Sequence, residues 1–329
     1  MKLDVIITTY NRAAHCLALV KSLLHEAEVH QVIIVDAGEK EYKPLGHIKE
    51  VLIRSKHKNQ PYQRYLGYRK SQADLLLYLD DDMEIIERDW YSIIKKYFTD
   101  NQVVAINIPF KNVNSFLDEL PSSAWNKTPW IKKLKGYLTG YPVAKPNSYI
   151  YCGIRGARIA NQPIAFLSGG SFAVKKEAMY INFNFQLFDL YEKRMGKGED
   201  GILGYSLSKL GHIGALDKQL FLHNDFKDSS YSVNHFEFNK KVLFSRKYLT
   251  FEYYRLLKNS TGLSNFRFNH YAIFRIIASA LAYIISPNDK NKLLFKGNKE
   301  GFSLSKKFRF KFDTNINNYW QAEATNELK

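Results

Sequence analysis

The stretch LLLYLDDDMEI, residues 75–85, places three consecutive acids at the end of a strongly apolar run. A run of this length and composition predicts a buried strand, with Asp80, Asp81 and Asp82 at its carboxyl end. Alternation along an extended chain sends Asp80 and Asp82 to one face and Asp81 to the other. Because adjacent carboxylates repel each other, this strand end is expected to hold a cation.

Similar apolar runs lie on both sides of this strand and alternate with helical patterns. The other predicted strands are LDVIITT at 3–9, QVIIVDAG at 31–38, EVLIRS at 50–55 and VVAINIPF at 103–110. The predicted helices between them are NRAAHCLALVKSLLHEA at 11–27, PYQRYLGYRKSQA at 61–73 and DWYSIIKKYF at 89–98. Continuous apolar strands separated by helices predict an α/β fold, with a mostly parallel sheet covered on both faces. Ligands bind such sheets beyond the carboxyl ends of the strands.

The second half of the chain is less regular. Residues 111–162 show little periodicity, and we expect this segment to form a functional loop region that includes the pocket for a second substrate. Order returns with IAFLSGGSFAVKKEAM at 164–179, two strands around a double glycine, and a last strand is predicted in IGALDKQLFLHNDF at 213–226. We therefore expect one domain over 1–230 and a separate basic, aromatic and mainly helical region over 231–329.

Composition restricts the partners and the compartment. The formal net charge is +16, most of it in the last third of the chain, which indicates acidic partners such as nucleotide phosphates or anionic lipids. Only two cysteines occur, Cys16 and Cys152, so no disulfide is expected and a reducing, cytoplasmic compartment fits. The apolar stretch 271–286 contains Arg275 and is shorter than the roughly 20 residues that span a bilayer.

The acids of residues 80–82 match the chemistry of a hard divalent cation. Mg²⁺ and Mn²⁺ prefer oxygen ligands and bind through one or two carboxylates together with substrate phosphates. A second acidic pair, Glu199 and Asp200 in GKGED, opens a predicted helix. Acids there stabilise the helix dipole, but beside a metal–diphosphate site one of them is also placed to accept a proton from an attacking hydroxyl.

Five motifs in this order resemble the family 2 glycosyltransferases, which have a GT-A fold. They are TTYNR at 8–12, VDAG at 35–38, YLDDDM at 78–83, LSGGSFAVKKEA at 167–178 and GED at 198–200. The resemblance covers roughly the first two thirds of the chain. It implies an inverting transfer from a nucleotide diphosphate sugar, expected to be UDP-linked, to a hydroxyl of a saccharide or lipid-linked acceptor. Surface polysaccharide synthesis uses such reactions.

The resemblance also implies roles for individual residues. Asp200 would be the general base with Glu199 beside it, and the DxD acid Asp82, helped by His223, would bind Mn²⁺ or Mg²⁺. The residues implied to contact the nucleotide sugar are Thr8, Tyr10, Arg12, Asp36, Arg64, Asp80, Asp81, Gly169 and Gly170.

Two other classes of protein fit part of the pattern. A nucleotidyltransferase that makes sugar nucleotides uses a similar sheet, but VIITTYNRAAH at 5–15 lacks the usual glycine-rich phosphate loop. A nucleic-acid-binding protein would explain the charge and the aromatic residues. Carboxylates crowd the predicted site, however, so no nucleic acid is expected there.

The region 231–329 suggests a membrane partner. Between 266 and 277, Arg267 and Arg275 interleave with apolar residues at helical spacing. The apolar residues in question are Phe266, Phe268, Tyr271, Ile273, Phe274, Ile276 and Ile277. Basic residues and an apolar helical face together favour binding to an anionic leaflet, so a peripheral position on the inner face of the membrane is expected.

Overall fold

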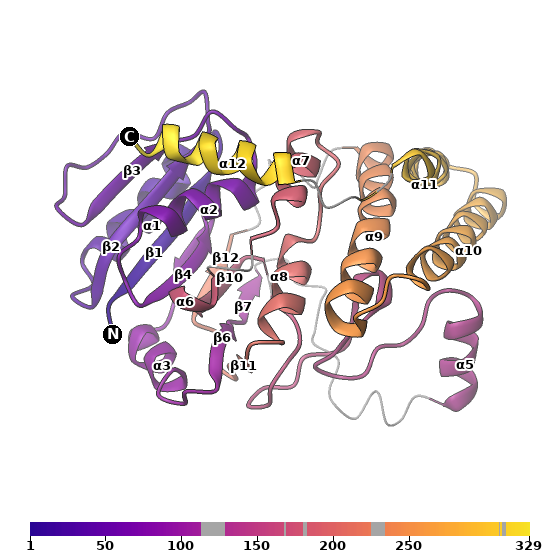
Figure 1. The fold of residues 1–329 in the computed structure, drawn as a ribbon, viewed down its shortest axis with the longest axis horizontal. Helices are drawn as coiled ribbons and strands as arrows, with labels where there is room; N and C mark the ends of the chain where they lie inside the picture. The colour runs from indigo at the N-terminus through magenta and orange to yellow at the C-terminus, as the bar shows by residue number, and fades with distance from the viewer. Residues whose placement is uncertain (113–128, 168, 180–182, 225–233, 309, 311–313) are drawn as a thin grey trace.

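A seven-stranded, mostly parallel sheet forms the centre of the N-terminal part (Figure 1). The computed structural model describes residues 1–112, 129–167, 169–179, 183–224, 234–308, 310 and 314–329. The strand order is β11-β6-β10-β4-β1-β2-β3, and β10 alone runs antiparallel to its neighbours. The strands are β1 (Leu3–Thr9), β2 (Val29–Asp36), β3 (Glu50–Arg54), β4 (Leu75–Asp80), β6 (Val103–Asn107), β10 (Ser171–Lys175) and β11 (His212–Ala215). The predicted α/β fold is confirmed.

Helices cover both faces of this sheet, which explains why its central strands are apolar without interruption. Val5 and Ile7 of β1 join the hydrophobic cluster under α1 and α3, whereas Ile6 joins the cluster on the opposite face under α2. Helices α6, α7 and α8 follow later in the chain. The bounds are α1 (Ala13–Leu24), α2 (Gln60–Lys70), α3 (Trp90–Tyr97), α6 (Lys176–Met179), α7 (Phe185–Glu192) and α8 (Glu199–Leu207).

Three details differ from the sequence prediction. The run at 164–167 is not a strand and forms only an isolated bridge through Ile164, because β6 and β4 already flank β10. The predicted last strand is two strands, β11 and β12 (Phe221–His223). Strand β12 leaves the main sheet and pairs between β5 (Met83–Ile85) and β7 (Phe110–Asn112).

The segment 111–162 contains regular structure in its described part. Helix α5 (Trp130–Leu138) is followed by the short strands β8 (Tyr149–Ile150) and β9 (Ile154–Arg155) and by the 3-10 turn η1 (Tyr151–Gly153). Residues 113–128 lie outside the described part, so the acceptor pocket that we expect there stays a prediction. Cys16 is a buried free thiol, and the side chain of Cys152 is not among those described.

The C-terminal region is helical, as predicted. Helices α9 (His235–Lys258), α10 (Ser264–Ile285) and α11 (Asp289–Lys307) pack side by side at the end of the molecule away from the sheet (Figure 1). The two-domain division stays a prediction, because its boundary at 230 falls within residues 225–233, which the structure does not describe.

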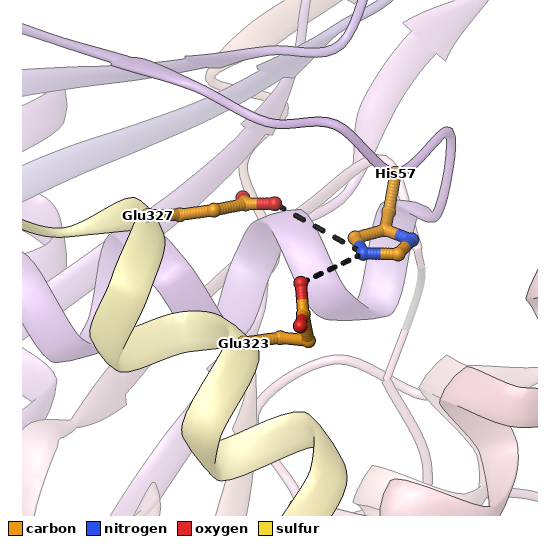
Figure 2. Close-up of side chains that lie close together, drawn as sticks. All are labelled: His57, Glu323 and Glu327. Atoms are coloured by element: carbon orange, nitrogen blue, oxygen red, sulfur yellow. Dashed lines mark ion pairs between the residues drawn. The ribbon is translucent and has the colours of Figure 1, made fainter.

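The last helix, α12 (Thr314–Glu327), returns to the N-terminal part and packs against α7 (Figure 1). Trp320 is 2% exposed, with its ring centroid 4.9 Å from that of Tyr62 and 5.7 Å from that of Phe188. Figure 2 shows His57, just before α2, facing two acids of α12; its Nε2 lies 3.5 Å from Glu323 and 4.0 Å from Glu327. The hydrophobic core of the sheet therefore includes side chains from both ends of the chain.

Candidate functional site

The three acids lie at the carboxyl edge of the sheet, as expected. Strand β4 ends at Asp80, which pairs in register with Thr8 of β1, and Asp81 and Asp82 form the turn into β5. The register therefore brings the end of β1 and the acidic turn together. Residues Thr8 to Arg12 follow from the same edge, so the first and third motifs of the sequence share one site.

The charge of this turn is balanced by the protein itself. Arg12 Nη1 donates hydrogen bonds to Asp81 at 3.0 Å and to Asp82 at 2.7 Å, and Thr9 Oγ1 donates to Asp81 at 2.7 Å. In the structure Arg12 contacts the acids, and its predicted contact with the nucleotide stays a prediction. A guanidinium group thus offsets the repulsion among the carboxylates. The sequence analysis had expected a metal ion alone to do so.

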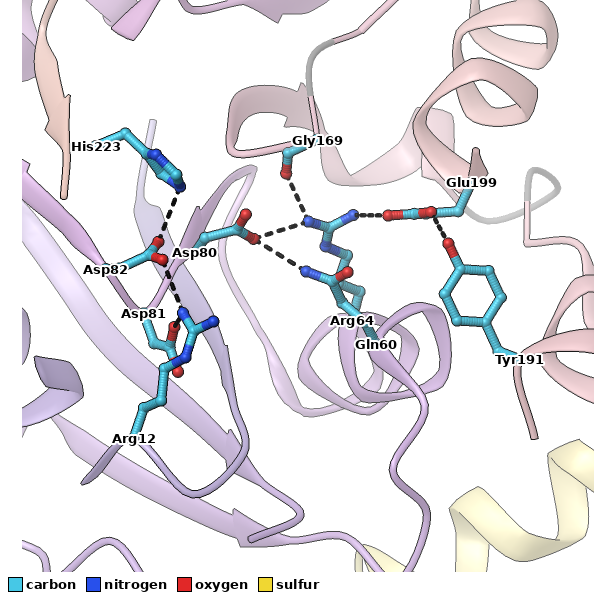
Figure 3. Close-up of polar contacts among 10 residues, drawn as sticks. All are labelled: Arg12, Gln60, Arg64, Asp80, Asp81, Asp82, Gly169, Tyr191, Glu199 and His223. Atoms are coloured by element: carbon cyan, nitrogen blue, oxygen red, sulfur yellow. Dashed lines mark hydrogen bonds and ion pairs between the residues drawn. The ribbon is translucent and has the colours of Figure 1, made fainter. Parts of the chain in front are cut away.

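Arg64 connects the acidic turn to the second acidic pair (Figure 3). From α2 its Nη2 donates to Asp80 at 3.2 Å and to the Gly169 carbonyl at 2.6 Å, and its Nη1 donates to Glu199 at 3.2 Å. Gln60, one turn earlier on α2, adds a 3.0 Å hydrogen bond to Asp80. One buried guanidinium therefore joins three segments that are far apart in the sequence.

Three side chains are arranged as a metal-binding group. The ligand atoms of Asp80, Asp82 and His223 all lie within 4.8 Å of one another. His223 reaches this position because β12 pairs with β5, in a register that sets His223 opposite Met83. Its Nε2 forms an ion pair with the buried Asp82 Oδ1 at 3.2 Å. Two carboxylates and an imidazole fit a divalent cation.

The electrostatic environment distinguishes the two carboxylates of this group. Desolvation raises the pKa of Asp80 to about 6, with Arg64 opposing the shift and Asp82 and Asp81 adding to it. For Asp82 desolvation acts in the same direction, but nearby His223 and Arg12 outweigh it and hold its pKa below the usual value. Asp82 therefore stays ionised more readily than Asp80, as suits the principal ligand. The sequence analysis placed Asp80 with the nucleotide, and in the structure it also belongs to the group that could hold a metal ion.

The second acidic pair sits in the first turn of α8. Gly198 precedes it with φ of 86°, a conformation that favours glycine and turns the chain into the helix. A Cβ at Gly198 would lie 3.0 Å from Leu249 of α9, so the C-terminal region directly supports this turn. The position of Glu199 and Asp200 thus depends on contacts with α9, which follows all five motifs in the sequence.

The two acids of this pair have different surroundings. Glu199 accepts hydrogen bonds on both oxygens, from Arg64 and from the Tyr191 hydroxyl, so the protein already fixes it in place. Among the described residues no side chain donates a hydrogen bond to Asp200. Desolvation, and then the charge of Glu199, raises the pKa of Asp200 above its ordinary value. A carboxylate with a raised pKa and no side-chain donor is suited to accept a proton.

The two glycines of the LSGG turn have different reasons for lacking a side chain. A Cβ on Gly170 would lie 2.6 Å from Met83 and 2.9 Å from Phe110, so close packing excludes it. A Cβ on Gly169 would come no closer than 3.8 Å to its nearest neighbour, Asp200. Gly169 therefore borders the site beside Asp200, where we predicted the donor sugar to approach.

The predicted nucleotide contacts on β1 and β2 surround the other side of the acidic turn. Thr8 is buried. The ammonium group of Lys58 lies over the Tyr10 ring, 3.5 Å from its centroid. Asp36 is 1% exposed and accepts hydrogen bonds from the backbone of Gly38 and Tyr42 and from Arg54. Asp36 thus organises the loop after β2, and a contact with a nucleotide would have to coexist with these bonds.

The structure adds residues that the sequence analysis did not select. Thr9, Gln60 and Tyr191 each hold an acid of the site, and Lys58 stacks on Tyr10. Of these, Thr9 lies inside the motif TTYNR. Because neighbouring strand residues point to opposite faces, its position next to Thr8 was a signal that it points elsewhere than Thr8. The others stand outside every motif.

Comparisons with known proteins identify the family of this chain. The family model Glycosyl transferase family 2 matches residues 4–180, more than half of the chain. Among solved structures, S. aureus TarS has a TM-score of 0.50 at 13% identity, covering 100% of this chain and 54% of that one. The 1–349 portion of S. aureus TarS has a TM-score of 0.49 at 13% identity, over 95% of this chain and 94% of that one. No curated protein sequence matches.

A third solved structure is the mannosyltransferase PcManGT from Pyrobaculum calidifontis in complex with GDP-Man and Mn²⁺. Its TM-score is 0.47 at 11% identity, over 93% of this chain and 86% of that one. At these identities the likenesses concern the fold.

Proposed function

The chain belongs to glycosyl transferase family 2, and on that premise we propose that it is an inverting, metal-dependent transferase that uses a nucleotide diphosphate sugar. One observation carries the proposal: Arg64 links Asp80 of the acidic turn to Glu199, the neighbour of Asp200, across a single site (Figure 3). A donor-binding group and a candidate base therefore face the same place, which transfer between two substrates requires.

The donor would bind along the carboxyl edge of the sheet. The family resemblance implies that the nucleoside contacts Thr8, Tyr10 and Asp36, which lie at this edge. Lys58 adds a positive charge above Tyr10. Asp82, Asp80 and His223 would hold Mn²⁺ or Mg²⁺. When bound, such an ion neutralises the diphosphate and stabilises the charge that develops on it as the leaving group. Asp81, tied to Thr9 and Arg12, fixes the turn that carries these ligands.

Asp200 would act as the general base. It takes the proton of the acceptor hydroxyl while that oxygen forms its bond to the anomeric carbon, and the carbon–oxygen bond to the diphosphate breaks in the same displacement. Attack opposite the leaving group inverts the anomeric configuration. Glu199, held by Arg64 and Tyr191, positions the turn and raises the pKa of its neighbour through its charge.

The finer identity of the substrates follows the family resemblance. We propose a UDP-linked donor and a saccharide or lipid-linked acceptor, as in surface polysaccharide synthesis. The site is proposed to work in the cytoplasm, where nucleotide sugars are made. The described part of the segment 111–162 supports a role near the acceptor, because Tyr149 packs beside Gly201, next to Asp200.

A thermal-shift panel of sugar nucleotides, with and without Mn²⁺, tests the proposal. We expect one donor to raise the melting temperature, more strongly with the ion than without it, because a ligand that binds only the folded state stabilises it. The matched nucleoside monophosphate, which lacks the diphosphate, should produce little Mn²⁺-dependent shift. A protein that responds to no sugar nucleotide, but binds plain RNA or DNA in a salt-sensitive way, would contradict the proposal.

A further inference from the structure

Helices α5 and α10 lie at the end of the molecule away from the sheet (Figure 1). Both carry large apolar side chains that are exposed. From Ile273 to Ile284 of α10 the exposed positions recur every three to four residues, and on α5 they occupy one side of an amphipathic helix. We call these residues the α5–α10 surface. They are Trp130, Ile131, Leu134 and Leu138 on α5, and Phe266, Ile273, Ile277, Leu281, Ile284 and Ile285 on α10. Their exposure reaches 70% at Trp130 and 80% at Ile285.

Direct contacts join the two helices. His270 Nε2 on α10 lies 2.7 Å from the carbonyl oxygen of Leu138, and the rings of Tyr141 and Tyr271 have centroids 5.5 Å apart. A Cβ on Gly140 would lie 2.8 Å from the Tyr271 backbone, so the chain after α5 packs tightly on α10. These contacts hold the carboxyl end of α5 against α10.

The fold of the chain does not require these exposed residues. Helix α10 uses another face for packing, with Phe268, Tyr271, Ala272 and Ser279 buried. Phe268 and Tyr271, which the sequence analysis counted toward a membrane face, thus belong to the protein interior. Large apolar side chains exposed over two adjacent helices are unusual for a soluble surface and mark an interaction site.

The charges around the stripes indicate what covers them. Neither WIKKLKGYL of α5 nor SNFRFNHYAIFRIIASALAYII of α10 contains an acid, and Lys132, Lys133 and Lys135 alternate with the apolar residues of α5. Lysines beside an apolar helical face are complementary to anionic headgroups above acyl chains. Helix α11 begins with Asp289 beyond the end of α10, so the positive charge is concentrated on α5. A protein partner would not require an extended apolar stripe beside a run of lysines.

We propose that the α5–α10 surface docks the protein on an anionic lipid bilayer, with both helices lying in the plane of the interface. The inference deepens the proposed function and rests on it, because a membrane position suits a lipid-linked acceptor. Contacts connect the surface to the catalytic turn: Arg267 of α10 lies over the Tyr151 ring at 5.3 Å, and Leu249 packs against both Gly153 and Gly198. An acceptor held at the bilayer would therefore lie on the side of the molecule that supports Asp200.

Helix α10 is long and apolar enough to cross a membrane by length and composition, and 22% of its apolar window is buried. Its polar contacts favour an in-plane position instead. Arg275, near its middle, bonds to Asn239 of α9 and to Asn298 of α11, two helices rich in lysine. Moving α10 across the bilayer would break these bonds or take charged helices into lipid.

Flotation with lipid vesicles tests the docking proposal on the full chain. We expect the protein to float with phosphatidylcholine vesicles that contain phosphatidylglycerol, and much less with phosphatidylcholine alone. The double variant Ile277→Glu/Leu281→Glu should lose flotation, and the triple variant Lys132→Gln/Lys133→Gln/Lys135→Gln should bind anionic vesicles on the order of a hundredfold more weakly. Ile48→Glu, at a 93% exposed position between β2 and β3, is the matched control and should float normally.

Several outcomes would overturn the proposal. These are absence of flotation for the unmodified protein, equal flotation of Ile277→Glu/Leu281→Glu and Ile48→Glu, and resistance to carbonate extraction, which would indicate a spanning helix. A fourth is a lower molecular mass of Ile277→Glu/Leu281→Glu than of the unmodified protein in light scattering, with equal flotation of the two. That result would assign the surface to a second copy of the chain. Donor-induced thermal shifts should be the same in all variants. A chain that floats but responds to no donor would refute the proposed function and leave the docking intact.

Discussion

Arg64 of α2 and Glu199 of α8 form a 3.2 Å ion pair between Nη1 and Oε1, in a region where the guanidinium is almost completely buried. The pair joins the helix that precedes the acidic strand to the turn that carries Asp200. The distance between donor site and candidate base is thus set by one side chain.

Replacing Arg64 with Met should destabilise the fold and the site together. Removing the guanidinium leaves the charges of Asp80 and Glu199 without the cation between them, and breaking a buried ion pair typically costs about 3–5 kcal/mol in the free energy of unfolding. Urea denaturation measures this cost. Arg69→Met, at an exposed position on the same helix, serves as the control and should change stability by about 0.5 kcal/mol or less. Equal effects of the two variants would show that the Arg64 cluster is not a structural element.

Asp200→Asn should abolish transfer and leave donor binding nearly unchanged. A general base contributes roughly 10²–10⁴-fold to a rate, and the amide keeps the size of the side chain but cannot accept the proton. Initial rates with an identified donor and acceptor, together with donor thermal shifts, separate the two effects. Glu199→Gln is the matched comparison and should retain more activity. Near-normal turnover of Asp200→Asn would exclude this residue as the base.

The pH profile should report the raised pKa of Asp200. Because burial and Glu199 disfavour its charged form, Asp200 becomes protonated at a higher pH than the ordinary value of 3.8. The rate constant kcat/KM should therefore fall as the pH is lowered, with its acidic limb above 3.8. Glu199→Gln removes the neighbouring charge and should move this limb to lower pH. If the limb stays in place in that variant, another group controls it.

Asp82→Asn should remove the dependence of donor binding on Mn²⁺. The loss of a direct ligand is expected to exceed the roughly 10–100-fold that an outer-shell partner contributes to metal affinity. Thermal shifts with donor, with and without Mn²⁺ and EDTA, measure it. Glu28→Gln, an exposed acid before β2, controls for the change of charge. Unchanged activity of the unmodified protein in EDTA would count against any metal role.

Trp320→Ala should loosen α12 from the sheet domain. Truncating a fully buried aromatic residue typically costs about 3–5 kcal/mol, because it removes apolar burial and leaves a cavity. The free energy of unfolding from urea titration is the readout. The neighbouring Tyr319 is 51% exposed, so Tyr319→Ala should cost clearly less. A Trp320 variant as stable as the Tyr319 variant would mean that α12 does not contribute to the core in solution.

Local patterns were sufficient to predict the sheet and the position of the acidic turn. The run LDVIITT predicted β1 with its observed bounds, because a central strand buried on both faces is apolar without interruption. Asp80 and Asp82 do group beside His223, but Asp82 reaches this place through the turn after β4 and not by alternation along a strand.

Other features depend on contacts that no local pattern encodes. Arg12 reaches Asp81 and Asp82 after a turn in which Asn11 has φ of 57°, a conformation the sequence did not reveal. Lys58 and Gln60 enter the site only because α2 docks beside β1 and β2. The apolar spacing of α12 would be the same whether Trp320 packed on α2 or on another helix, so its return to the sheet domain could not be predicted.

The return of α12 also constrains how the chain can fold during synthesis. Tyr62 and Phe188 lie in the core beside Trp320, yet they are translated long before it. Domains generally fold from the N-terminus as the ribosome elongates them, so this patch stays open to water until Trp320 emerges. The sheet domain therefore cannot be completed cotranslationally in sequence order. A premature stop before α12 would produce a chain that contains every family motif and still exposes an unfinished, aggregation-prone core.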